Sequence, residues 1–138
     1  MRVWTTFTVL VALSSPISAS APEMRPIKDF LIENADASNG GTEVFIGLRC
    51  SSIFSIMEKY AADNGMADAS TKFKEASFAA LKFAADNQNP FDKGYISGQM
   101  KLMIESYADR FLKSKAMTGN FSDDEVISSD IETCGEIF

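Results

Sequence analysis

The feature that most constrains the fold of this chain is the placement of its only two cysteines, Cys50 and Cys134. Each lies on the apolar side of a predicted helix, so both side chains are expected to point into one core. An even cysteine count favours pairing once a chain is exported. The bridge would close a loop of 134 − 50 = 84 positions, which the chain-entropy model values at roughly 4 kcal/mol. We predict a structural disulfide, because a redox pair has C-x-x-C spacing and a metal site needs more ligands than two thiols.

Apolar residues recur at intervals of three and four along the chain, which is the pattern of amphipathic helices. The clearest helix covers 42–65, with Thr42 as its cap and an Asn-Gly pair as its end. Its many apolar residues lie on more than one side, so we expect it to be the central helix. They are Phe45, Ile46, Leu48, Cys50, Ile53, Phe54, Met57 and Tyr60.

Four further helices are predicted around the central one. A short helix follows Pro26 and is stopped by Asn39, Gly40 and Gly41. Alanine-rich 68–89 ends before Pro90, and 94–119 has a start that Gly94 and Gly98 weaken. The last helix covers 123–134, with a Ser122–Glu125 capping box and Gly135 as its stop.

No alternating strand pattern and no internal repeat occurs, so the expected fold is all-α, a small bundle of four to five helices stapled by one disulfide. The expected organisation is a cleaved signal peptide at 1–19, an N-terminal segment with a short helix at 20–41, and a helical-bundle core at 42–138. The last two belong to one single domain.

The first residues have the three-part layout of a secretory signal peptide: Arg2, an apolar run over 3–13, and a patch of small residues. Cleavage is expected after Ala19, because cleavage after Ala21 would leave Pro22 at the new N-terminus. An uncleaved anchor is the alternative, but the apolar run is too short to cross a bilayer. We expect a periplasmic or extracellular protein with no stable membrane association after cleavage.

The charge and the residue types exclude several classes of function. The chain has 13 basic and 19 acidic residues, and this acidic balance argues against nucleic acid as a partner. It contains no histidine, which removes imidazole triads, His-ligated metals and haem attachment through C-x-x-C-H. We expect no cofactor and no metal. A calcium loop starting at Asp36 fails because Gly40 and Gly47 occupy its fifth and twelfth positions.

Methionine and phenylalanine are the only suggestive excess. Met57, Met66, Met100 and Met103 are candidates for a pliable groove that binds a peptide, an unfolded client or a lipid tail. The alternative is that these side chains fill the core between alanine-rich helices.

In size, export and cysteine number the chain resembles small one-disulfide periplasmic proteins, among them acid-stress chaperones of the HdeA type; no run of residues carries the resemblance, so it implies no site. The leading hypothesis is an exported non-enzymatic binding protein. It would engage a protein partner, including as its inhibitor, or an apolar ligand through a helix groove, and its acidic charge favours a basic partner. An acid-stress chaperone is the alternative, and an enzyme using carboxylates or Lys is least favoured. The oligomeric state stays open.

Overall fold

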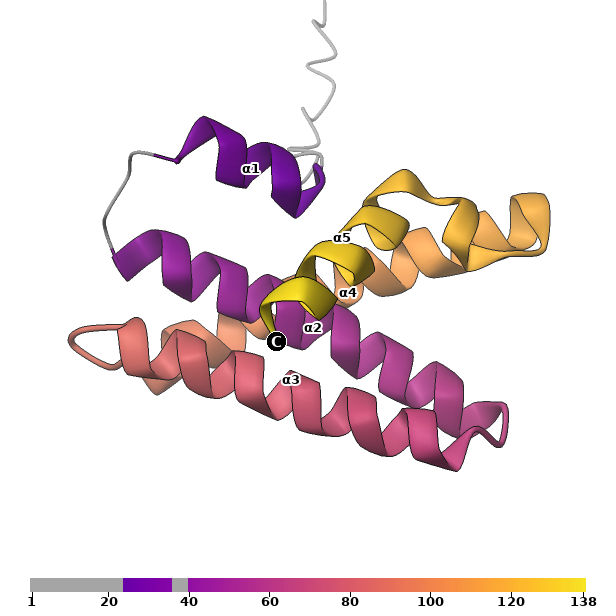
Figure 1. Ribbon diagram of the computed structural model, residues 1–138, viewed down its shortest axis with the longest axis horizontal. Helices are drawn as coiled ribbons and strands as arrows, with labels where there is room; N and C mark the ends of the chain where they lie inside the picture. The colour runs from indigo at the N-terminus through magenta and orange to yellow at the C-terminus, as the bar shows by residue number, and fades with distance from the viewer. Residues whose placement is uncertain (1–23, 36–39) are drawn as a thin grey trace, which may run out of the picture.

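The computed structural model describes residues 24–35 and 40–138 (Figure 1). This part of the chain is helical and contains no strand, so the predicted all-α bundle with one disulfide is confirmed. Its elements are α1 (Ile27–Glu33), α2 (Gly40–Asp63), α3 (Ala67–Asn87), α4 (Lys93–Thr118), the 3₁₀ turn η1 (Phe121–Asp123) and α5 (Glu125–Ile137). The predicted signal peptide lies outside the described residues. Among the helices just named, none combines the length and the apolar character that crossing a bilayer requires.

Helix α2 is the centre of the structure, as the sequence predicts. It contacts α3, α4 and α5, and Figure 1 shows it passing across the middle of the molecule. Half of its residues, 12 of 24, are buried, whereas α4 buries only Ile96 and Tyr107 among its 26. Burial on several sides explains why α2 carries apolar residues around most of its circumference.

Helices α2 and α3 approach closely because small residues meet at their contact. A Cβ atom on Gly47 would lie 2.7 Å from both the Ala80 carbonyl oxygen and the Ala84 Cβ. The Ser77 hydroxyl donates to the Ser51 carbonyl at 2.9 Å, and the Ser55 and Ser77 hydroxyls lie 2.9 Å apart. The hydroxyls of these serines are therefore satisfied by hydrogen bonds within the contact between α2 and α3.

The start of α2 differs from the prediction. The helix begins at Gly40, so Thr42 lies inside it and is not its cap, and Gly40 and Gly41 do not stop α1. Helix α1 ends earlier, at Glu33. The reason is packing: a Cβ atom on Gly40 would lie 2.8 Å from the Asn87 carbonyl oxygen, so a glycine lets α2 start against the end of α3.

The start of α4 and both ends of α5 also differ from the prediction, because the glycines near them influence the helix boundaries less than expected. Asp92 accepts a hydrogen bond from the Tyr95 amide at 2.9 Å, which starts α4 before the two glycines that should weaken it. The predicted Ser122–Glu125 capping box is wrong, because Asp124 caps α5 through the Ile127 amide at 3.0 Å. Helix α5 also continues through Gly135 to Ile137.

Candidate functional site

The predicted disulfide joins Cys50 of α2 to Cys134 of α5, with the two Cα atoms 5.4 Å apart. Both residues are completely buried. The bond therefore ties the last helix to the central one, as the sequence analysis expects. Because neither sulfur reaches solvent, the pair is structural and is not placed for exchange with an external thiol.

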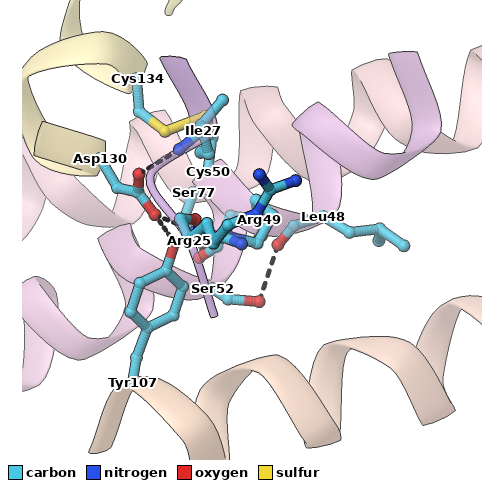
Figure 2. Close-up of a disulfide and its surroundings, with 11 residues drawn as sticks. Arg25, Ile27, Leu48, Arg49, Cys50, Ser52, Ser77, Tyr107, Asp130 and Cys134 are labelled. Atoms are coloured by element: carbon cyan, nitrogen blue, oxygen red, sulfur yellow. Dashed lines mark hydrogen bonds and ion pairs between the residues drawn. A yellow bond between two sulfur atoms is a disulfide. The ribbon is translucent and has the colours of Figure 1, made fainter. Parts of the chain in front are cut away.

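A buried group of three polar side chains, here called the Arg49 network, lies beside the disulfide (Figure 2). Arg49 precedes Cys50 on α2, and Asp130 lies one turn before Cys134 on α5. The Arg49 guanidinium donates to the Asp130 carboxylate, and its Nε donates to the Tyr107 hydroxyl at 2.8 Å. That hydroxyl in turn donates to the same Asp130 oxygen. The three side chains thus connect α2, α4 and α5.

The Arg49 network also holds the backbone at the start of α1. The Ile27 amide donates to the second Asp130 oxygen at 2.7 Å, and the Arg49 guanidinium donates to the Arg25 carbonyl at 2.9 Å. The guanidinium carbon lies 5.6 Å from the centre of the Phe45 ring and 5.3 Å from that of Tyr107. One ion pair therefore fixes the relative positions of four helices.

The titration of the network reflects its burial. Loss of solvent raises the pKa of the Tyr107 hydroxyl well above its ordinary value, which the nearby Arg49 charge opposes and the Asp130 charge reinforces. Burial alone would lower the pKa of Arg49, but its interactions with Tyr107 and Asp130 outweigh that effect and raise it. Tyr107 therefore stays a neutral donor, and Arg49 stays charged.

The Arg49 network is placed to hold the fold together and not to act on a substrate. Arg49 is 5% exposed, and Tyr107 and Asp130 are not exposed at all. Nor do the residues of 24–35 and 40–138 bring together three or more Cys, Asp or Glu side chains that could hold a metal ion.

An open hollow of about 610 Å³ lies along α3 and is here called the α3 groove. Phe78 stands in it with 70% of its surface exposed. Leu81 also lines the groove, and it packs on the buried cluster of Val44, Leu48, Ala84 and Ile96. Seven residues line the groove: Glu58 from α2, and Thr71, Lys74, Glu75, Ser77, Phe78 and Leu81 from α3.

The four predicted methionines do not gather at one place. Met100 and Met103 pack on the same buried cluster as Leu81, and neither of them lines the α3 groove. Met57 is buried in α2 at 7% exposure, and Met66 is 41% exposed at the turn between α2 and α3. Met66 lines a separate shallow hollow formed by residues 65–69.

Sequence reasoning overlooked three residues that matter here: Arg49, Asp130 and Phe78. Asp130 falls on the apolar face of the last helix, four positions before Cys134, and Arg49 interrupts an apolar stretch of the central helix. A charge of each sign on an apolar face is a signal for a buried pair. Phe78 lies off the apolar stripe of its helix, which is a signal for an exposed aromatic.

The comparisons with known proteins add no family. No protein-family model matches the sequence, and neither a curated protein nor a solved structure is significantly similar to it.

Proposed function

We propose that this chain is an exported, non-enzymatic binding protein whose α3 groove takes the apolar ridge of a helix from a basic protein partner. The observation that carries the proposal is Phe78, a large aromatic ring that is 70% exposed inside a groove. Exposed aromatic residues set in a concave surface are typical anchors of protein interfaces. An amphipathic helix laid in such a groove buries its apolar face.

Charge supports a basic partner. Glu58 and Glu75 line the groove against one lysine, Lys74, and the whole chain carries a net charge of −6. Charges at the rim of an interface steer association and contribute less to its final strength. We therefore expect the apolar contact at Phe78 and Leu81 to provide most of the affinity, and the acidic residues to favour Lys- and Arg-bearing helices over acidic ones.

The structure of the core supports a fixed groove. Both α2 and α3 are anchored below it, because Leu81 packs on a buried cluster and the serines of the two helices are hydrogen-bonded to one another. A preformed surface loses little conformational entropy on binding. In one form of this function, the chain would inhibit a basic secreted enzyme by binding one helix of that enzyme.

The test uses a synthetic amphipathic helix with leucines on one face and lysines on the other, and a second peptide in which glutamates replace the lysines. Calorimetry should show binding of the basic peptide, weaker binding of the acidic one, and a loss of about thirtyfold or more in Phe78→Glu, since removing an interface anchor costs about 2 kcal/mol or more. Leu112→Glu is the matched control, because Leu112 is 65% exposed on α4, outside the groove. Equal binding by wild type and Phe78→Glu would refute the groove.

The acid-stress chaperone hypothesis predicts a different result. Its apolar surface would become exposed only when carboxylates are protonated, well below neutral pH. An apolar dye whose fluorescence rises steeply on acidification while helicity persists would favour the chaperone, and it would count against a groove that is already open at neutral pH.

A further inference from the structure

We propose that the surface beneath α1 is a peptide-binding site. Residues 24–33, here called the arm, fill it as a ligand on the same chain, and a segment of the same chemistry from another protein takes their place when the arm leaves. The polar part of this surface, here called the arm site, consists of two ion pairs, Arg49 with Asp130 and Arg110 with Asp124. None of these four residues lines the α3 groove, so the proposal does not depend on the proposed function.

The bundle itself holds the polar groups of the arm site in position. Arg49 of α2 pairs with Asp130 of α5, and Arg110 of α4 pairs at 2.9 Å with Asp124, the cap of α5. Neither pair includes an atom of the arm. A guanidinium has five N–H donors, so each arginine keeps donors for a further partner after it has bound its carboxylate. The site is therefore organised by residues other than those it binds, as a preorganised receptor is.

These polar groups contact the backbone of the arm. The two arginines donate to consecutive carbonyls, those of Met24 and Arg25, at 2.9 Å each. The Ile27 amide then donates to Asp130 at 2.7 Å (Figure 2). Between them, Pro26 has no N–H that would need a partner, and its φ of −52° and ψ of 140° are those of an extended chain. Main-chain hydrogen bonds to an extended segment provide affinity in many peptide-binding proteins.

Two side chains of the arm decide which segment fits. Pro26 and Ile27 are the only buried residues of the arm, and Ile27 is 0% exposed within the main core cluster. The Arg25 side chain pairs instead with Glu33 of the arm itself, where both are exposed, so the bundle does not select for it. The ligand class is therefore an extended segment in which a proline precedes an aliphatic residue at the start of a short helix.

The arm behaves as a ligand because its helix is not stable alone. Helix α1 has seven residues, well below the roughly 12–15 at which isolated helices are marginal in water, so it is helical only when docked. A segment with few buried contacts opens at a lower free energy than the rest of a domain. We therefore expect the arm to leave while α2 to α5 stay folded. Because a ligand on the same chain has a high effective concentration, a segment from another protein competes well only once the arm is weakened.

Fluorescence anisotropy with a labelled peptide of residues 24–35 tests the proposal on the full chain with its disulfide intact. Ile27→Glu should release the arm and bind the peptide at least about tenfold more tightly than the wild type, whose own arm fills the site. Ile32→Glu is the matched control, because Ile32 is 75% exposed on the same helix, and it should behave like the wild type. A peptide methylated at the Ile27 nitrogen should bind about tenfold more weakly or worse, since it lacks the donor to the buried Asp130 carboxylate.

Three peptide results would overturn the proposal: a folded Ile27→Glu variant that does not bind the peptide, equal binding by Ile27→Glu and Ile32→Glu, and equal binding of the methylated peptide. Hydrogen exchange of the wild type tests the same idea without any variant. The amides of residues 31–33 should exchange well before those in the buried middle of α2. If both exchange only together, the arm is part of the core and not a ligand, and an Ile27→Glu variant that fails to fold would show the same.

Discussion

Replacing Asp130 with asparagine tests how strongly the Arg49 network holds the bundle. Asp130 is fully buried and accepts from the Ile27 amide, the Tyr107 hydroxyl and the Arg49 guanidinium. Asparagine keeps the shape but removes the negative charge, so the guanidinium stays buried without its counterion. Breaking a buried pair in this way costs about 3–5 kcal/mol. A domain of ordinary stability, about 5–15 kcal/mol, would be close to unfolding.

Urea unfolding followed by circular dichroism measures this cost, with the slope against urea as the check on two-state behaviour. Arg49→Met and the double variant Arg49→Met/Asp130→Asn complete a double-mutant cycle. The double variant should lose less than the sum of the single losses, by about 0.5–3 kcal/mol, because each single variant leaves one group unpaired. Asp63→Asn is the surface control: Asp63 pairs with Lys59 at the exposed surface, and its loss should cost less than about 1 kcal/mol.

The result that would refute the reasoning is a loss below about 1 kcal/mol in Asp130→Asn with an unchanged urea slope. The network would then be a tolerated polar group, and the disulfide and apolar packing would hold α1 and α5 without it. Additive losses in the cycle would lead to the same conclusion, since they would show that the two charges act independently.

Three further outcomes follow from the core. Gly47→Ala should destabilise the protein by about 1–3 kcal/mol, as overpacking does, because its Cβ would meet α3 at 2.7 Å; the control Gly135→Ala, in open space, should gain up to about 0.5 kcal/mol in urea unfolding. Burial raises the pKa of Tyr107, so its contribution to stability is complete below the unfolded value near 10 and declines as pH rises above it. Tyr107→Phe should flatten this alkaline decline in unfolding measured at several pH values. Replacing Cys50 and Cys134 with alanine should cost about 4 kcal/mol for a loop of this length and should raise amide exchange throughout α5; an unchanged exchange rate would show that α5 does not depend on the bridge.

The helices and the disulfide were predictable because both follow from periodicity. Cys50 and Cys134 each fall in an apolar stripe, and stripes that face one core bring their members together. The central place of α2 was predictable for a related reason, since a helix that is apolar on several sides must be covered on several sides.

The Arg49 network was harder to predict, because pairing depends on the three-dimensional arrangement. Arg49 and Asp130 are 81 positions apart, and nothing local connects them. The start of α2 had a similar cause: Gly40 is a stop signal in isolation, but here it lies against the end of α3. The α3 groove was not predicted, because the candidate groove was based on methionines, which fill cores as readily as they line surfaces. Phe78 was overlooked because it lies outside the apolar stripe of its helix.

The bond between Cys50 and Cys134 closes the backbone between them into a ring and leaves one tail on each side. The ring holds the second half of α2, then α3, α4 and most of α5, together with the exposed residues 89–92 between α3 and α4. A protease that cuts there would leave two fragments in one molecule, which a reducing gel separates and a non-reducing gel does not. Helix α1 lies outside the ring, so a cut between it and α2 would leave it attached only through non-covalent contacts. A single cut there would therefore let α1 leave once its hydrogen bonds to Asp130 and Arg49 break, whereas a single cut inside the ring separates no helix until the disulfide is reduced.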